Sequence, residues 1–315
     1  MTTIRSTHRL LGLSAILILT GTAWGQNTYH ASIDAWRTER EATIKADDGW
    51  LTVTGLFWLK EGRNNFGTGA DNEIVLPSGS GPTRAGTFLL KEGKITLQVV
   101  EDADVSLAGK AIHSLDVKTD AKGPPDVLRI ADLSLTVIKR GQRYGVRLKD
   151  RHSRNRKEFT GLRWYPVQES FRIAARFIPY DQPKEIEIVN VIGDVEKSKS
   201  PGVLTFTLQG QQYRLEPIVD EGKLFIIFKD LTSGKTTYPA GRFLYAEAPK
   251  DAPKESIVTL DFNQAINPPC AFTAFATCPL PPRQNRLNIA IEAGEQTYHA
   301  GGVIPNNRQK RRSRR

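Results

Sequence analysis

The chain has 315 residues and a formal net charge of +10 at pH 7, with 39% hydrophobic and 25% charged residues. Two arginines before residue 10 and six basic residues from 308 to 315 supply most of this charge and leave +2 for the body. A nearly neutral body excludes an extended phosphate-binding groove, so no nucleic-acid partner is expected. The length suits one large domain or two ordinary ones, and two are favoured.

The N-terminal residues have the pattern of a cleavable secretory signal. Arg5 and Arg9 precede a mostly apolar run over 10–23, and small residues favour cleavage after Gly25. The run is shorter than the roughly 20 residues of a membrane-spanning helix, and no later stretch approaches that length. We therefore expect residues 1–25 to be removed, and a mature protein without a transmembrane segment in the periplasm or the medium. An uncleaved anchor is the alternative.

A single helix is predicted over 34–45, within a lead-in of residues 26–49. The apolar residues Ile33, Trp36 and Ile44 fall roughly on one side of it. From residue 50 onward the pattern changes to short β-branched and aromatic runs separated by Gly, Asn, Asp and Pro. This pattern is typical of antiparallel sheets, so we expect an all-β protein with one N-terminal helix.

Two β domains are predicted. About eight short strands between residues 50 and 150 indicate a β-sandwich. The segment 150–157 is polar, cationic and free of aliphatic residues, and we take it as the boundary. A second antiparallel domain, a sandwich or a barrel-like fold, is expected over 151–300. Alternation of polar and apolar residues over 185–189 is typical of a sheet with one solvent-exposed face.

Asn, Pro and Cys residues are concentrated between residues 261 and 295. Pro removes sheet donors and Asn favours turns, so this Cys- and Pro-rich segment is expected to be an ordered, irregular loop of the kind that often carries function. It holds both cysteines, Cys270 and Cys278, and in an exported chain a disulfide between them is expected. A reactive thiol is the alternative. It requires a nearby cation, and the segment offers only Arg283 and Arg286.

Amide and hydroxyl side chains of this region are candidates for binding a small or polymeric ligand. The candidate binding residues are Asn263, Asn267, Asn285 and Tyr238. Together with the neighbouring carboxylates they also offer the oxygen ligands that Ca²⁺ or Mg²⁺ prefers, although such residues more often hold turns. The histidines have no zinc-motif spacing, so neither a metal nor a cofactor is expected.

Four charged residues are candidates for catalysis. Asp261 and Glu295 could form an acid–base pair, with Arg242 holding a negative group. Arg242 enters an apolar stretch, and a buried guanidinium requires a carboxylate partner, here Asp230 or Asp261, or a bound anion. Because the serine-hydrolase, dinucleotide and zinc-peptidase motifs are absent, enzyme activity is left open. A hydrolase is the alternative to a binding or envelope-associated module.

Residues 301–315 are expected to form a basic, disordered tail. A solvated terminus is the simpler interpretation of such a charge run. The alternative is contact with anionic cell-surface polymers, which would weaken as the salt concentration rises.

Several short sequence motifs of the chain occur together in one known family. These are the motifs at 49–59, 145–150, 228–234 and 238–242 and the segment 261–295. In combination they resemble the bacterial family DUF1684 over roughly 36–295. That family is of unknown function, so the resemblance implies no catalytic residue.

The order of features in the first β set is similar to that of forkhead-associated domains. It runs from Gly62-Arg63-Asn64 through a glycine-led strand to Leu107-Ala108-Gly109. The loop that would hold phosphothreonine in those domains corresponds to 81–86, which lacks the family's Ser and His. The resemblance therefore implies the sandwich fold alone.

Overall fold

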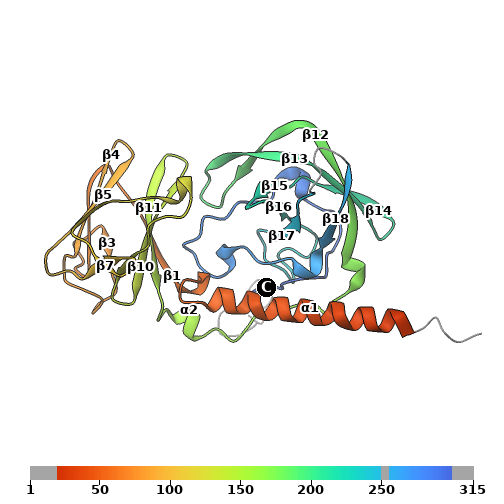
Figure 1. Cartoon of the computed structure of the whole chain (residues 1–315), viewed down its shortest axis with the longest axis horizontal. Helices are drawn as coiled ribbons and strands as arrows, with labels where there is room; N and C mark the ends of the chain where they lie inside the picture. The colour runs from red at the N-terminus through yellow and green to blue at the C-terminus, as the bar shows by residue number, and fades with distance from the viewer. Residues whose placement is uncertain (1–19, 250–254, 300–315) are drawn as a thin grey trace, which may run out of the picture.

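The computed structural model describes residues 20–249 and 255–299 as two β lobes, with one long helix below the second of them (Figure 1). The first nineteen residues of the predicted signal and the predicted tail at 301–315 lie outside the described residues. Helix α1, Thr20–Lys45, begins earlier than the sequence pattern predicts. Among the described residues, no helix is long and apolar enough to span a membrane.

The first lobe is a sandwich of a six-stranded and a five-stranded sheet. Its apolar core includes Phe66, Phe88 and Val137, whose side chains are almost fully buried. In sheet order, the six strands are β1 (Val53–Trp58), β11 (Arg143–Asp150), β10 (Leu133–Arg140), β9 (Leu128–Ile130), β6 (Val105–Leu107) and β7 (Lys110–Ala111). The five strands are β3 (Ile74–Val75), β2 (Gly62–Gly67), β4 (Gly86–Lys91), β5 (Lys94–Val99) and β8 (Ser114–Asp116), and only β2 and β3 pair in parallel.

The second lobe pairs a four-stranded with a three-stranded sheet. The four strands are β14 (Gln211–Leu215), β13 (Val195–Leu208), β12 (Arg172–Val189) and β18 (Ser256–Asp261). The three strands are β15 (Ile218–Asp220), β16 (Lys223–Phe228) and β17 (Arg242–Glu247). The predicted fold class is confirmed, and of its two forms for this lobe the structure has the open sandwich and not a closed barrel.

Short helical pieces connect these elements. Helix α2, Arg154–Lys157, lies in the polar segment between the lobes. The 3-10 helices are η1 (Trp50–Thr52), η2 (Asp120–Lys122), η3 (Glu169–Phe171), η4 (Phe262–Gln264), η5 (Pro269–Ala271) and η6 (Arg283–Asn285).

The segment 261–295 contributes to the core of the second lobe. Its apolar side chains are buried against the strands, among them Phe262, Ala265, Ile291 and Ala293. Its backbone bonds to β17, where Phe243 and Ile266 exchange two hydrogen bonds of 2.9 and 2.8 Å. The segment is thus irregular and tightly packed, which leaves few of its side chains facing solvent.

Helix α1 packs along the second lobe through polar side chains. The guanidinium of Arg37 donates to the carbonyl of Tyr165 at 2.8 Å. The carboxylate of Glu41 accepts from the backbone N–H of Leu162 at 3.0 Å and from the indole of Trp164 at 3.2 Å. The sequence pattern predicts this helix within a lead-in of residues 26–49, and in the structure its side chains bond to the second lobe.

Candidate functional site

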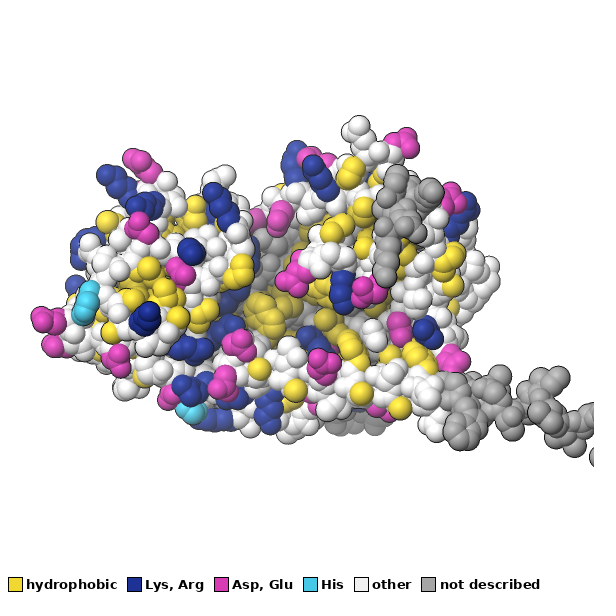
Figure 2. Space-filling model, in the orientation of Figure 1, with side chains coloured by type: hydrophobic (Ala, Val, Ile, Leu, Met, Phe, Trp, Pro, Cys, Tyr) yellow, Lys and Arg dark blue, Asp and Glu magenta, His cyan; other side chains and the backbone are white. Residues whose placement is uncertain are grey.

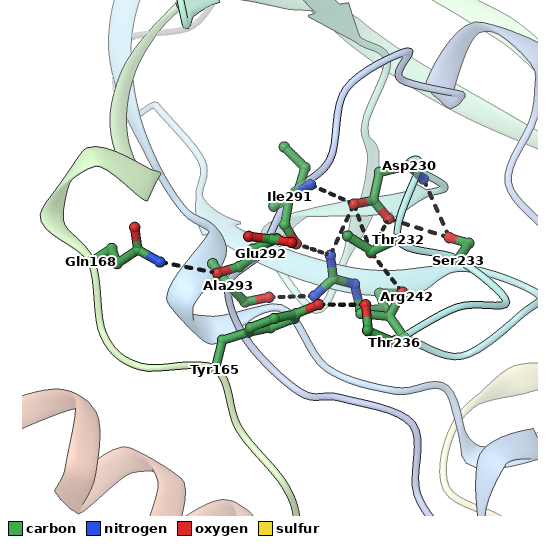
Figure 3. Close-up of polar contacts among 11 residues, drawn as sticks. Tyr165, Gln168, Asp230, Thr232, Ser233, Thr236, Arg242, Ile291, Glu292 and Ala293 are labelled. Carbon is green, nitrogen blue, oxygen red and sulfur yellow. Dashed lines mark hydrogen bonds and ion pairs between the residues drawn. The ribbon is translucent and has the colours of Figure 1, made fainter. Parts of the chain in front are cut away.

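Arg242, the first residue of β17, lies in a fully buried polar cluster (Figure 3). Its guanidinium pairs with Asp230 at 3.4 Å and donates to the carbonyls of Ile291, at 2.8 Å, and Ala293. The Asp230 carboxylate also accepts from the backbone N–H of Ile291 at 2.7 Å and from the Thr232 hydroxyl. Of the two predicted partners the structure selects Asp230, so the charge of Arg242 is balanced within the protein.

Glu295 is the centre of a second buried cluster. Its side chain is fully buried and accepts from Arg40 of α1 at 2.9 Å and from the backbone N–H of Asn267 at 2.8 Å. Burial raises the pKa of the Glu295 carboxyl, and Arg40 opposes this effect. Gly294, with φ of +77°, brings Glu295 into place, since a Cβ there would lie 2.4 Å from the carbonyl oxygen of Ala265.

Asp261 belongs to a third cluster, again with α1. Its carboxylate accepts from the Tyr29 hydroxyl at 2.9 and 2.8 Å and from the backbone N–H of Asn263 at 3.1 Å. Burial, followed by the hydrogen bond to Asp261, raises the pKa of Tyr29. Among the described residues, Asp261 and Glu295 contact different partners and not each other. An acid–base pair of these two carboxylates stays a prediction.

The predicted binding residues use their polar groups on the protein's own backbone. Asn263 bonds the backbone of Gln168 in both directions, at 2.8 and 3.0 Å. The Asn267 amide donates to the carbonyl of Gln296 at 2.8 Å, and the Tyr238 hydroxyl donates to the carbonyl of Cys270 at 3.0 Å. In the structure these side chains thus join backbone segments that are far apart in the chain.

Asn285 fastens the end of the segment to the strands. It accepts from the N–H of Glu216 at 2.8 Å and donates to the carbonyls of Glu216 and Ile227 at 2.9 and 3.0 Å. Within residues 20–249 and 255–299, no group of three or more His, Cys, Asp or Glu side chains is arranged to hold a metal ion. A Ca²⁺ or Mg²⁺ site from the oxygen ligands of this region stays the less favoured alternative.

Glu216 gives this region a testable pH dependence. Burial raises the pKa of its carboxyl, but hydrogen bonds from Lys184, Tyr180 and Gln284 outweigh burial and hold it below its ordinary value of 4.5. Because the pKa of Glu216 is lower in the folded state than in the unfolded state, the ionised carboxylate stabilises the protein above pH 4.5. This stabilisation is lost as the pH falls through the folded-state pKa. Glu216→Gln should therefore cost about 1–3 kcal/mol at neutral pH.

Melting curves by circular dichroism between about pH 3 and about pH 7 check this prediction. The melting temperature of the wild type should fall more steeply on acidification than that of Glu216→Gln, so that the two curves converge at low pH. Parallel curves would contradict it. Glu185→Gln is the matched control, because Glu185 pairs with Lys197 at 2.7 Å on the exposed face of β12.

A groove of about 620 Å³ lies between α1 and the strands β15–β17, and Gln264 and Ile266 of the segment 261–295 line it. In Figure 2, acidic and basic side chains border the hollow between α1, along the lower edge, and the second lobe above it. From α1 the groove takes Trp36, Glu39 and Arg40. Arg40 also holds the buried Glu295, so the groove wall connects directly to the second polar cluster.

The groove combines aromatic surface with an excess of carboxylates. The strands β15–β17 and their turns contribute three carboxylates, Asp220, Glu221 and Glu247, of which Glu247 pairs with Lys223 at 3.0 Å. Asp220 and Tyr245 share a hydrogen bond of 3.3 Å, and Tyr245 stacks on Phe225 with ring centroids 4.8 Å apart. Burial, followed by the charge of Asp220, raises the pKa of Tyr245.

None of these groove residues is among the candidates predicted from the sequence. A stripe on α1 at helical spacing, Trp36, Arg40 and Thr43, is a signal for the helix wall. For the opposite wall the sequence offers no signal, because Asp220 and Tyr245 meet only through the pairing of β15, β16 and β17.

The cysteines lie together as free thiols, so the predicted disulfide is not formed in this structure. The backbone N–H of Cys270 points at the sulfur of Cys278 at 3.1 Å. Cys278 is buried in an apolar cluster with Phe225 and Phe243, and Cys270 is partly exposed at its border. The two thiols are near enough to react with a common partner.

Comparisons with known proteins match part of the chain. The family model described as "Protein of unknown function (DUF1684)" matches residues 157–296, so the motifs at 49–59 and 145–150 lie outside the matched range. The solution NMR structure of an uncharacterized protein from Haloarcula marismortui is 32% identical, covering 45% of this chain and 79% of that one, with a TM-score of 0.39.

A second solved structure comes from a study of phosphothreonine-dependent interactions of a forkhead-associated domain. It is 16% identical and covers 30% of this chain and 92% of that one, with a TM-score of 0.21. No curated protein matches the chain.

Proposed function

We propose that this chain, whose residues 157–296 belong to the DUF1684 family, is an exported binding module that takes a small cationic ligand in the groove between α1 and β15–β17. One observation carries the proposal: the groove holds more carboxylates than cations, next to aromatic rings. Organic cations are bound by carboxylates and by aromatic faces, and ligand sites are concave surfaces with a few such polar groups.

The cations of the groove are already engaged, which favours a positively charged ligand over an anion. Lys223 pairs with Glu247, and Arg40 pairs with the buried Glu295. Among the described residues, Glu39 and Glu221 form no ion pair. The carboxylate of Asp220 accepts one hydrogen bond there, from the hydroxyl of Tyr245. A bound cation would find at least two uncompensated negative charges.

The hydrolase alternative has weaker support. Glu295 is fully buried behind Arg40, and Asp261 is held by Tyr29 and Asn263. A general acid or base must come within hydrogen-bond reach of the group on which it acts. Neither carboxylate lines the groove, so we favour binding without chemistry at this site.

Export is supported by the signal pattern and is compatible with the position of the groove. All the α1 side chains named above, from Tyr29 to Glu41, follow Gly25 in the chain. Cleavage there would leave the contacts of the helix with the second lobe and the groove wall in the mature protein. Contact of the basic tail with anionic surface polymers, which would retain the protein at the envelope, remains part of the proposal.

Titration of the mature protein with spermidine tests the proposed site. At about 0.15 M salt, where exposed charges are screened beyond about 8 Å, calorimetry should detect binding and the melting temperature should rise. Glu39→Gln combined with Asp220→Asn should weaken this binding at least tenfold, which corresponds to about 1.4 kcal/mol.

A charge-matched control separates the groove from general attraction. Glu101 and Asp102 are exposed in a turn of the first lobe, and Glu101→Gln with Asp102→Asn removes the same charge. This control should bind spermidine as the wild type does. Equal weakening in both variants, or no heat with spermidine, would overturn the proposed function.

A further inference from the structure

The guanidinium of Arg147, on β11 of the first lobe, lies at the boundary with the second lobe. Arg147 is only 9% exposed, and its Nε has no hydrogen-bond partner. The guanidinium carbon lies 5.1 Å from the ring centroid of Trp50. Among the described residues no carboxylate pairs with it. Burying a guanidinium without a carboxylate costs free energy, and a nearby anion, such as a bound ligand or a thiolate, would offset that cost.

Trp50 connects this cation to the two thiols, because Trp50 and Cys270 both pack against the apolar cluster that contains Cys278. Arg147 acts electrostatically on Cys270 and on Cys278, and burial lowers the pKa of Arg147 to about 10. The lobes are joined at the same place, since Arg140 of β10 donates to the hydroxyl of Thr277 at 2.9 Å. A cation from a strand of the first lobe thus shares the neighbour Trp50 with Cys270, and a nearby cation is the condition for a reactive thiol.

The environments of the two cysteines differ. A hydrogen bond with the Cys278 side chain, supported by Arg147, lowers the pKa of the Cys270 thiol. The hydrogen bond with Cys270 and burial raise the pKa of the Cys278 thiol. Cys270 is also the more exposed of the two. A partly exposed thiol beside a buried one is the arrangement of an attacking and a resolving cysteine.

We propose that Cys270 and Cys278 form a thiol–disulfide exchange site for small aliphatic disulfides, with Cys270 attacking, Cys278 resolving and Arg147 positioned to stabilise the thiolate. None of these residues lines the groove, so the site is independent of the proposed cation binding. It differs from a static cross-link because the pair would cycle between dithiol and disulfide.

The exchange balances in two steps. The Cys270 thiolate attacks one sulfur of the small disulfide, a bond forms between them, and the disulfide bond breaks to release one thiolate, which takes up a proton. Cys278 then loses its proton to solvent and attacks the Cys270 sulfur, releasing the second small thiolate, which is also protonated. Two protein thiols are oxidised to a disulfide, and the small disulfide is reduced to two thiols.

Reaction of the reduced protein with bis(2-hydroxyethyl) disulfide, followed by mass spectrometry, tests the site. Wild type should end as the internal disulfide, with no reagent attached. Cys278→Ser should accumulate one reagent adduct, and peptide mapping should place it on Cys270. Because a free thiol near pKa 8.5 is only a few per cent ionised at neutral pH, native Cys270 should react about tenfold faster than the urea-unfolded chain.

Arg147→Met should slow adduct formation on Cys270 about tenfold, and Arg147→Lys should restore part of the rate. Arg129→Met is the matched control, since Arg129 lies in the same sheet and donates to Ser134. Three results would each overturn the proposal: an adduct on Cys278, a native rate no faster than the unfolded rate, or a folded Arg147→Met variant of unchanged rate. The comparison of native with unfolded wild type remains decisive if Arg147→Met fails to fold.

Discussion

Arg242→Met should lower the free energy of unfolding by about 3–5 kcal/mol, the cost of breaking a buried ion pair by removing one partner. The loss follows from what the variant leaves behind: the Asp230 carboxylate, 1% exposed, and the carbonyls of Ile291 and Ala293 without their donor. Methionine fills a similar volume, so the change reports on charge and hydrogen bonding more than on a cavity. Urea denaturation at neutral pH measures it.

Two further variants show whether the loss comes from the pair. Asp230→Asn in the Arg242→Met background should cost less than the sum of the two single changes, because the second substitution removes the unpaired charge. Arg176→Met is the matched control. Arg176 pairs with Glu255 on an exposed surface, with both side chains more than half exposed, and its loss should cost no more than about 1 kcal/mol. Additive single losses, or an Arg242→Met variant as stable as this control, would show that the pair does not hold the segment 261–295 to β17.

The sequence predicts the elements of this fold because their signals are local. Alternation of apolar and polar residues over a few positions is sufficient to indicate strands such as β12, and Asn and Pro are sufficient to indicate an irregular path after Asp261. The function of that path has no comparable local signal. A buried amide and an amide that binds ligand have the same sequence, and only the positions of distant backbone groups, such as Gln168 beside Asn263, distinguish them.

The groove and the thiol site depend on contacts between segments far apart in the chain. Arg147, which shares the neighbour Trp50 with Cys270, comes from a strand of the other lobe, whereas the cations near the cysteines in sequence are Arg283 and Arg286. In the same way, Arg40 reaches Glu295 across 255 positions. A single sequence specifies that Glu295 and Arg40 are charged, but not that one will be buried against the other.

Arg40→Met should be nearly as damaging as Arg242→Met, with a loss of about 3–5 kcal/mol at neutral pH. Arg40 is the cation that α1 supplies to the fully buried Glu295, and it also donates to the carbonyl of Asn267 at 3.2 Å. Without it the carboxylate is buried next to the N–H of Asn267 alone. Hydrogen exchange should show faster opening of α1, and spermidine binding should weaken because the helix forms one wall of the groove.

The pH dependence of this variant identifies Glu295 as the cause. Burial already raises the pKa of Glu295 above its ordinary value of 4.5, and loss of Arg40 removes the charge that opposes this rise. A raised folded pKa means that the folded state binds the proton more tightly, so stability is fully present below about 4.5 and is lost as the pH rises through the folded pKa. The deficit of Arg40→Met relative to wild type should therefore be smaller at about pH 5.5 than at about pH 8.

Glu295→Gln in the Arg40→Met background should remove this pH dependence and recover part of the stability, since a neutral amide needs no cation. Asp34→Asn provides the control on the same helix, because Asp34 is 70% exposed and its ion pair with Arg37 spans 3.7 Å. Its effect should stay within about 0.5 kcal/mol. If Arg40→Met showed the same deficit at both pH values, Glu295 would not be the group left unpaired, and the attachment of α1 would have to rest on Tyr29 and Glu41 instead.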